Sequence, residues 1–342
     1  MNKVLITGGA GFIGVNYAAR QLGRGEALVI YDNLSRPGAD NNIEWLRDRF
    51  GKNAFEFIKA DVRDFASLQK GMQGADVIVH LAAQVAVTTS VTNPREDFEI
   101  NALGTFNVLE AARKMPNPPL VIYASTNKVY GELENAVVVE EQDHYRYLDL
   151  PYGIPETQPL DFHSPYGCSK GSGDQYVRDY HRIYHIPTVV LRQSCIYGTR
   201  QFGIEDQGFL AWFVIAAVTG RPITIYGDGK QVRDILFIED LMDLYDACIV
   251  NKQHVAGKIY NVGGGPDNTL AIWRQFEPIL ADLKGEHTDV DYSEWRPGDQ
   301  LVYVSDIRKA QAELGWSPKI GVLKGIEMLY NWVNEHRSLF ST

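Results

Sequence analysis

The chain has 342 residues, of which 45% are hydrophobic, and its formal net charge is -10. This length suits one large or two medium domains, and the negative charge argues against nucleic acid or an anionic membrane as a partner. The three cysteines lie far apart, which argues against a disulfide framework and a paired-cysteine metal motif. No apolar run reaches membrane-spanning length and the first residues read as a strand, so we expect a cytoplasmic protein without a bound metal.

A glycine-rich turn follows the first predicted strand. Gly8, Gly11 and Gly14 recur at three-residue spacing after the apolar run of residues 4–6. The first glycine allows a tight turn, the second lets the backbone approach a pyrophosphate, and the third lets the next helix pack closely on the sheet. Free N–H groups at the start of that helix then face the phosphates. The predicted dinucleotide contacts at this turn are Gly8, Gly11, Phe12, Ile13 and Gly14.

A second apolar run, residues 27–31, ends at Asp32, about 20 residues after the glycines. A carboxylate at this place accepts hydrogen bonds from the adenosine ribose and repels a 2′-phosphate, so the sequence favours NAD over NADP. Arg36 lies shortly after it. Three roles stay open for Arg36: pairing with a 2′-phosphate, facing a substrate phosphate, or lying in solvent as a loop cation.

Strands and helices alternate through the first half of the chain. This pattern predicts an α/β fold with a Rossmann-type, doubly wound parallel sheet and a smaller, discontinuous C-terminal substrate domain. The predicted strands are Lys3–Thr7, Ala27–Tyr31, Phe55–Lys59, Val77–Leu81, Leu120–Ala124 and Pro187–Arg192. The predicted helices are Phe12–Gly23, Phe65–Gly71, Pro94–Lys114 and Gly167–Tyr184.

The pattern changes at about residue 198, where loops lengthen. Two later strands, Ile235–Ile238 and Lys258–Val262, are expected to return to the first domain. The predicted domains are residues 1–197 plus about 233–263, and about 198–232 plus 264–342.

Two further segments have a recognisable character. Glu132–His163 is long, polar and contains prolines, which is typical of a lid or an interface. Gly325–Arg337 has the apolar spacing of an amphipathic helix, with Ile326, Leu329, Tyr330 and Val333 on one side. We expect that helix to pack within its domain.

Tyr166 and Lys170 lie four residues apart at the start of a predicted helix, so their side chains share one face. A phenol has a reference pKa of about 10, and a nearby ammonium together with the positive nicotinamide of NAD⁺ lowers it toward neutrality. Tyr226 and Lys230 have the same spacing, but the Gly-Asp-Gly between them predicts a turn. The helix that begins near Tyr166 is predicted to face the sheet through Tyr176, Tyr180 and Ile183.

Hydroxyl side chains follow the fifth predicted strand. Ser125 and Thr126 come directly after it, and ligands of open parallel sheets bind beyond the carboxyl ends of the strands. A hydroxyl there either orients a reacting alcohol or merely caps the strand. The small residues Leu81–Ala83 end the fourth strand in a similar place, where a flat cofactor fits.

Together these motifs resemble the extended short-chain dehydrogenase/reductase family of nucleotide-sugar enzymes. The resemblance covers nearly the whole chain, through Thr7–Gly14, Asp32-Asn33, Asp61-Val62, Leu81–Ala83, Asn101, Ser125–Gly131, Tyr166–Lys170, Arg192, Tyr197-Gly198, Gly227–Asp234 and Arg296–Asp299. It implies a catalytic triad of Thr126, Tyr166 and Lys170.

The resemblance also implies two sets of binding residues. Beyond the glycine turn, NAD is expected to contact Asp32, Asn33, Asp61, Val62, Leu81, Ala82, Ala83, Asn101, Ser125, Tyr166, Lys170 and Gln193. The nucleotide sugar is expected to contact Asn127, Lys128, His163, Cys195, Gln201, Tyr226, Arg233 and Arg296. The two arginines suit a diphosphate because a guanidinium donates in a fork.

The residues after Thr126 bear on the chemistry. The family's 4,6-dehydratases carry an Asp-Glu pair there, whereas this chain has Asn127-Lys128. Dehydration is therefore not expected, and the motifs most resemble 2-epimerases of CDP-linked deoxysugars. The implied reaction is redox-neutral. Tyr166 takes the proton from the hydroxyl at carbon 2, tightly held NAD⁺ takes the hydride, and the hydride returns to the opposite face of the 2-keto sugar.

Two alternatives stay open at this point. The first alternative is a UDP-hexose 4-epimerase or another nucleotide-sugar epimerase with the same triad. The second is a non-catalytic NAD-binding protein. The resemblance further implies a homo-oligomer, either a dimer or a tetramer, and a CDP-linked sugar as the favoured partner.

Overall fold

The computed structural model describes residues 2–296 and 299–340 and divides into two compact units. The first unit comprises residues 2–129, 162–192 and 242–260. The second comprises residues 130–161, 193–241, 261–296 and 299–340. Pro297 and Gly298 of the expected Arg296–Asp299 motif lie outside the described residues.

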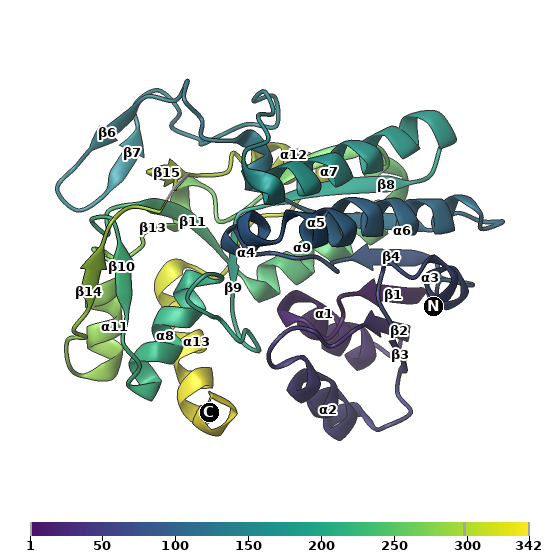
Figure 1. The fold of residues 1–342 in the computed structure, drawn as a ribbon, viewed down its shortest axis with the longest axis horizontal. Helices are drawn as coiled ribbons and strands as arrows, with labels where there is room; N and C mark the ends of the chain where they lie inside the picture. Colours follow the sequence, from purple (N-terminus) through teal and green to yellow (C-terminus); the bar gives the residue numbers. More distant parts are fainter. Residues whose placement is uncertain (1, 297–298, 341–342) are drawn as a thin grey trace. The chain divides into compact units, whose positions relative to one another are not determined.

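The first unit is built on a seven-stranded sheet with the order β12-β8-β5-β4-β1-β2-β3 (Figure 1). The strands from β3 through β1 to β5 pair in parallel, and the strand order reverses between β1 and β4. Ligands of such sheets bind at this reversal. The strands are β1 (Lys3–Thr7), β2 (Ala27–Asp32), β3 (Glu56–Lys59), β4 (Val77–His80), β5 (Leu120–Thr126), β8 (Thr188–Gln193) and β12 (Lys258–Val262). The predicted fold class is confirmed.

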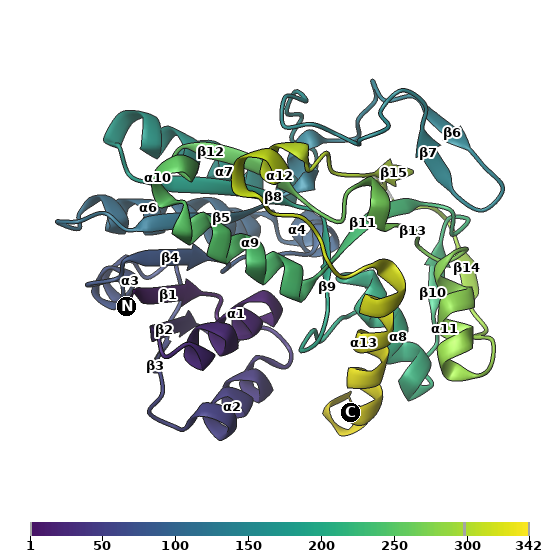
Figure 2. The same ribbon diagram turned by 180° about the vertical axis from the view of Figure 1, so that it is seen from behind.

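Helices cover both faces of this sheet, with α6 and α7 on one face and α1 on the other (Figures 1 and 2). The α-helices are α1 (Phe12–Gly23), α2 (Ala39–Phe50), α3 (Phe65–Gly71), α4 (Val87–Thr92), α5 (Pro94–Phe98), α6 (Gly104–Arg113), α7 (Ser164–Tyr184), α9 (Ile238–Val250) and α10 (Lys252–Val255). The helix predicted over Pro94–Lys114 is thus interrupted by a π-helical turn, η1 (Glu99–Leu103).

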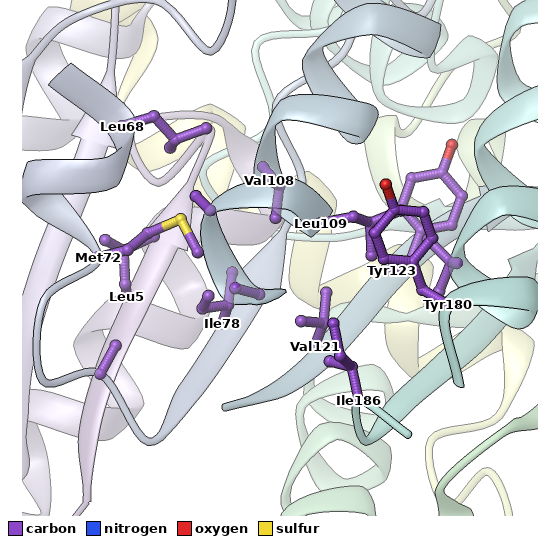
Figure 3. Close-up of a cluster of buried hydrophobic side chains, with 14 of the residues drawn as sticks. Leu5, Leu68, Met72, Ile78, Val108, Leu109, Val121, Tyr123, Tyr180 and Ile186 are labelled. Atoms are coloured by element: carbon purple, nitrogen blue, oxygen red, sulfur yellow. The ribbon is translucent and has the colours of Figure 1, made fainter. Parts of the chain in front are cut away.

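A buried apolar cluster fills the space between the sheet and helices α3, α6 and α7 (Figure 3). Leu5, Ile78 and Val121 come from the centres of β1, β4 and β5, whose fully apolar runs are typical of strands covered on both faces. Gly173 brings α7 against the same sheet, because a Cβ there would lie 2.4 Å from the hydroxyl oxygen of Tyr123.

The predicted face of α7 is wrong for two of its three residues. Tyr180 is buried, whereas Tyr176 and Ile183 are 48% and 61% exposed. The buried face runs through Gly173 and Val177, because the close contact at Gly173 fixes which side of the helix meets β5.

The second unit contains three small sheets. β11 is central to a four-stranded sheet, where it pairs with β9, β13 and β15, while β10 pairs with β14 and β6 with β7. The strands are β6 (Val138–Glu140), β7 (Tyr145–Tyr147), β9 (Cys195–Tyr197), β10 (Thr224–Tyr226), β11 (Val232–Phe237), β13 (Thr269–Ala271), β14 (Asp291–Ser293) and β15 (Val302–Tyr303). The helices are α8 (Phe209–Thr219), α11 (Phe276–Lys284), α12 (Arg308–Leu314) and α13 (Val322–Glu335).

The expectation that the strand near residue 235 returns to the first domain is wrong. β11 is buried along its whole length and pairs with β9, β13 and β15 in the second unit. β12, by contrast, joins the seven-stranded sheet as expected. By their contacts, residues 130–161 and 193–241 also belong to the second unit, which shifts the boundaries from those drawn on the sequence.

The long segment expected to be a lid or an interface contains the β6–β7 hairpin. Tyr147 donates a hydrogen bond of 2.8 Å to the carbonyl oxygen of Val302, and Lys230 Nζ lies 2.7 Å from Glu140 Oε1. These contacts fix the hairpin within the second unit. Further along the chain, α8 packs against the amphipathic helix α13, which buries Ile326, Leu329 and Val333.

Candidate active site

The turn from β1 into α1 has the geometry that its glycines predicted. Gly8 has φ of +69°, and a Cβ there would lie 2.7 Å from the backbone nitrogen of Ala82. A Cβ on Gly14 would lie 2.5 Å from the carbonyl oxygen of Gly8. At Gly11 a Cβ would meet only that same oxygen, at 3.2 Å, so the space above the turn is open to a ligand. Phe12 and Ile13 begin α1 directly beside it.

Asp32 ends β2 beside this turn. Its carboxylate accepts hydrogen bonds from the backbone N–H of Ala10 at 3.0 Å and of Leu34 at 2.7 Å. Burial raises the pKa of Asp32, and these two donors oppose that effect. Each carboxylate oxygen keeps acceptor capacity for a ligand hydroxyl.

Asn33 and Asp61 contact each other across the ends of β2 and β3. The Asn33 amide donates to Asp61 at 2.9 Å, and Arg63 forms a two-point contact with the same carboxylate. The hydrogen bond from Arg63 lowers the pKa of Asp61 to about 2. Val62 is buried against Gly104. The two cofactor candidates Asp61 and Val62 therefore lie on a loop that the ion pair with Arg63 holds in place.

The residues after β4 are fixed by Asn101, which lies in the π-helical turn η1. Its side-chain oxygen accepts from the backbone N–H of Gln84 at 2.9 Å, and its amide donates to the carbonyl oxygen of Gln84 at 3.0 Å. Leu81, Ala82 and Ala83 lie just before Gln84, half-buried, between the end of β4 and this anchor. Single π-helical turns are frequent at functional sites.

Tyr166 lies in the first turn of α7, where its backbone N–H donates to Ser90 Oγ at 3.1 Å. Burial raises the pKa of the Tyr166 phenol to about 12. A hydrogen bond from Thr126 and the positive charge of Arg36 both lower it, whereas the charge of Asp97 raises it. Thr126 and Tyr166 are thus brought together, and the half-buried Arg36 lies close enough for its positive charge to act on the phenol.

Lys170 lies one turn further along α7 and is buried. Its ammonium donates to the carbonyl oxygen of Ala124 at 2.7 Å and lies 4.4 Å from the centre of the Tyr123 ring. Burial lowers the pKa of Lys170 to about 7, and the carboxylates of Asp174 and Asp97 raise it. At neutral pH this ammonium is therefore poised between its charged and neutral forms.

Ser125 contacts a buried ion pair. Its hydroxyl donates to Asp174 at 2.7 Å, and Asp174 accepts from Arg192 through two nitrogens at 2.9 Å each. This arrangement ties β5, α7 and β8 together. The Ser125 hydroxyl is engaged there, so the structure gives it a packing role beside its predicted cofactor contact.

Three substrate candidates lie close to the triad in the chain. Asn127 and Lys128 begin the 3₁₀ turn η2 (Asn127–Tyr130), and the backbone N–H of Lys128 donates to Thr126 Oγ1 at 3.2 Å. Asn127 is buried, while His163 is the extended residue that precedes α7. All three therefore flank the elements that carry Thr126 and Tyr166.

The other substrate candidates lie in or at the edge of the second unit. The Arg296 guanidinium stacks 3.9 Å from the centre of the Tyr226 ring and lies 3.1 Å from Asp206. Arg233 donates to Asp299 at 2.6 Å from its place in β11. Cys195 begins β9, and Gln201 is buried with its side-chain oxygen unpaired among the described residues. The cofactor candidate Gln193 ends β8.

Two buried polar residues near Lys170 were missed by the sequence reasoning. His80 is buried, contacts the hydroxyls of Thr7 and Thr105 at 2.7 and 3.0 Å, and has a pKa lowered to about 3 by burial. Asp97 contacts Ser169 at 2.5 Å. The sequence carried one signal for Asp97, since it lies one helical turn before Asn101.

No group of His, Cys, Asp or Glu side chains suited to a metal ion occurs within residues 2–296 and 299–340. In the same described ranges, no helix is long and apolar enough to cross a membrane.

Comparison with known proteins identifies the family. The family model described as GDP-mannose 4,6 dehydratase matches residues 5–329. A CDP-paratose 2-epimerase from Salmonella typhi is 43% identical over 339 residues, which cover 97% of this chain and 99% of the relative.

Two solved structures share the fold. A UDP-glucose 4-epimerase from Thermus thermophilus in complex with NAD has a TM-score of 0.81 and 30% identity, covering 98% of this chain and 99% of that one. A dTDP-glucose 4,6-dehydratase from Streptomyces venezuelae with NAD bound has a TM-score of 0.83 and 28% identity, covering 98% of each chain. These matches confirm the resemblance drawn from the motifs, and the chain belongs to the GDP-mannose 4,6 dehydratase family of extended short-chain dehydrogenases/reductases.

Proposed function

We propose that this protein is an NAD-dependent epimerase of a nucleotide-linked sugar, acting at carbon 2 of a CDP-linked deoxysugar of the paratose type. The observation that carries the proposal is the buried Tyr166 phenol, which is hydrogen-bonded to Thr126 and lies one helical turn from Lys170. Full-length similarity to a CDP-paratose 2-epimerase supports the same substrate class.

The residues of the first unit fit NAD. The open space above Gly11 suits a pyrophosphate, because position 11 has no side chain to occupy it. The Asp32 carboxylate suits a ribose diol and repels a 2′-phosphate. Relatives of the same fold are solved with NAD bound. When bound, NAD⁺ accepts a hydride from the substrate carbon and supplies it again from the reduced form.

The chain's own residues then manage the proton. Tyr166 as phenolate takes the proton from the sugar hydroxyl, and Thr126 orients that hydroxyl through the same hydrogen-bond network. Lys170 stabilises the phenolate and holds the nicotinamide ribose. Protonated Tyr166 returns the proton after the keto sugar has presented its other face. Catalysis on this account is mainly positioning and proton transfer.

Asn127 and Lys128 support epimerisation over dehydration. Water elimination needs an acid/base pair after Thr126, and the Asn127 amide cannot serve as a member of such a pair because it neither gives nor takes a proton near neutral pH. Asn127 is buried beside Thr126, and its side-chain oxygen lies 3.3 Å from the Thr126 hydroxyl oxygen. We propose that the Asn127 amide contacts a sugar oxygen, while the choice of carbon 2 rests on the similarity to a CDP-paratose 2-epimerase.

A UDP-hexose 4-epimerase is the second candidate. The 30% identical UDP-glucose 4-epimerase of the same fold favours it, and the same triad would serve a different carbon. We further propose that the nucleotide diphosphate contacts Arg233 and Arg296, with Tyr226 beside the base.

We also propose that the protein is a homo-oligomer. Apolar side chains on α5, α6 and α7 are exposed together, among them Phe98, Phe106 and Tyr176, whose exposed fractions are 57%, 37% and 48%. Exposed apolar clusters of this kind mark association surfaces. Light scattering should give a mass above that of one chain, and Phe106→Glu should reduce it. A monomeric mass for the parent protein would refute the oligomer.

The test of function is NMR of purified protein with CDP-paratose and no added NAD. Conversion to CDP-tyvelose is expected, because the cofactor remains bound to the protein. Absence of conversion, even with NAD added, would refute the assignment. The same assay on UDP-glucose and UDP-galactose separates the second candidate from a non-catalytic protein.

A further inference from the structure

Asp97 is a buried carboxylate that the proposed reaction does not use. It lies in α5, is 1% exposed, and precedes Asn101 by one turn. Its Oδ1 accepts from the side-chain amides of Gln84 and Asn101 at 3.0 and 3.1 Å. Its Oδ2 accepts from Ser169 Oγ at 2.5 Å. A buried carboxylate with three donors is held in one position.

Ser169 connects this carboxylate to the candidate catalytic residues. It lies in α7 directly before Lys170, and its hydroxyl oxygen is 3.1 Å from the backbone oxygen of Tyr166. The amide of Asn101 also donates to Ser169 Oγ at 3.1 Å. Asp97 therefore fixes the turn of α7 that carries Tyr166 and Lys170, from a different helix.

We propose that Asp97 is a positioning residue of the active site, which holds the first turn of α7 through Ser169 and balances the charge of the Lys170 ammonium. The proposal rests on the proposed function in assigning proton transfer to Tyr166. The contacts that carry it do not depend on which sugar is bound.

The charged and titratable groups around Tyr166 and Lys170 come from several elements. Asp174 lies on α7 and is paired with Arg192 of β8, while the positive charge of Arg36, in the loop after β2, acts on Tyr166. His80 of β4 stays neutral at physiological pH because burial lowers its pKa to about 3, and the Tyr123 phenol of β5 is neutral because burial raises its pKa. Asp97 is thus one of two carboxylates that offset the charge of Lys170.

The electrostatic direction is the same for both residues of the pair. Burial lowers the pKa of Lys170 and raises that of Tyr166, and in each case the negative charge of Asp97 raises the pKa. Removing that charge lowers both values. Both limbs of a pH–rate profile then move to lower pH, whichever residue each limb reports.

The first experiment compares pH profiles of kcat and KM for the holoenzyme and for Asp97→Asn. Asparagine has the same shape as aspartate, and its side-chain oxygen still accepts from the Gln84 amide. Its own amide can donate to Ser169 Oγ, and the Ser169 hydroxyl hydrogen then points to the backbone oxygen of Tyr166. We expect both limbs of the kcat profile to move acidward by about half a pH unit or more, with little change in KM. Glu96→Gln removes a charge from the neighbouring position of α5 and should leave the limbs in place.

A second measurement needs no substrate and so is independent of the proposed function. Phenolate absorbance is titrated in NAD-loaded protein, and subtracting the Tyr166→Phe curve isolates Tyr166. Subtracting the curve of the double variant Asp97→Asn/Tyr166→Phe from that of Asp97→Asn isolates the Tyr166 titration in the absence of the Asp97 charge. The pKa of Tyr166 should be lower there than in the parent protein. If Asp97→Asn does not fold, Asp97→Ser carries the same expectation.

The proposal would be overturned if folded Asp97→Asn showed the parent's pH–rate limbs and the parent's Tyr166 titration. A lower melting temperature alone would then indicate a purely structural role for Asp97. A move toward higher pH would overturn it as well. Failure of every nucleotide sugar to react would refute the proposed function but leave the titration as a valid test of Asp97.

Discussion

At the scale of single residues, burial shifts the pKa values of Tyr166 and Lys170 in opposite directions. Burial holds the Tyr166 pKa at about 12 and the Lys170 pKa at about 7, so each is driven toward its neutral form. Catalysis needs the reverse, a phenolate beside an ammonium. The positive charge of Arg36 and the hydrogen bond from Thr126 favour the phenolate, and the bound cofactor adds a further positive charge.

Tyr166→Phe should lower turnover by at least about 100-fold, because it removes the proton acceptor and leaves the ring in place. NAD binding should change little, since the glycine turn and Asp32 are untouched. Turnover is measured by NMR and cofactor content by absorbance of the denatured protein. Turnover near the parent rate would show that another group transfers the proton.

Lys170→Met should stabilise the protein without cofactor at neutral and acidic pH. The folded pKa of about 7 lies below the ordinary value of 10.5, so below pH 7 the buried charge costs its full amount. Between these values the unfolded state binds more protons and the parent gains stability as pH rises. Below pH 7 the variant should exceed the parent in unfolding free energy by about 1–4 kcal/mol, reduced by the loss of the hydrogen bond to Ala124. This difference should vanish as the pH rises past 10.5, where lysine is neutral in both states.

Thermal melting across this pH range checks the prediction. The same substitution should abolish turnover, so that stability and activity change in opposite directions. A gain that is constant with pH would show that packing, rather than charge, decides the difference.

At the scale of elements, the close approach of α7 to β5 depends on Gly173. A Cβ on Gly173 would meet the Tyr123 hydroxyl oxygen at 2.4 Å, so Gly173→Ala forces the helix away from β5. We expect a loss of about 1–3 kcal/mol in unfolding free energy. Gly23→Ala at the end of α1 is the matched control, since nothing lies within 4 Å of its Cβ. It should cost nothing and gain up to about 1 kcal/mol.

Denaturant unfolding of the two variants measures the difference. Equal stability of Gly173→Ala and Gly23→Ala would contradict the close packing of α7 on β5. Reduced activity in Gly173→Ala with a normal fold would follow from displacement of Tyr166 on the same helix.

The elements with strong local signals were predictable from the sequence. β1, α1, α3 and β12 have the predicted bounds, because apolar runs and flanking glycines mark them. Helix α2 was missed, since its polar stretch ADNNIEWLRDRF buries only a narrow face. The partners of β11 were also misjudged, because an apolar strand fits any sheet and only tertiary contacts choose one.

The candidate site shows the same limit. Thr126 and Tyr166 were predictable because each follows a local motif at the end of a strand or the start of a helix. The contact between Asp97 and Ser169 joins residues 72 apart in the sequence, and no local pattern announces it. The exposure of Tyr176 depends likewise on how Gly173 rotates α7 against the sheet.

At the scale of the whole molecule, the family and the fold leave one central claim, that the sugar is oxidised and reduced again at the same carbon. The cofactor must stay bound through both steps, because its release would leave the keto sugar behind. We therefore expect purified protein to contain NAD in proportion to its activity.

The most direct measurement is NMR of CDP-paratose turnover in D₂O by the protein as purified. We predict conversion to CDP-tyvelose without deuterium at carbon 2, because the hydrogen removed from that carbon returns to it as hydride. Deuterium at carbon 2 would show proton exchange with solvent and contradict the redox mechanism. No conversion would contradict the assignment of this substrate.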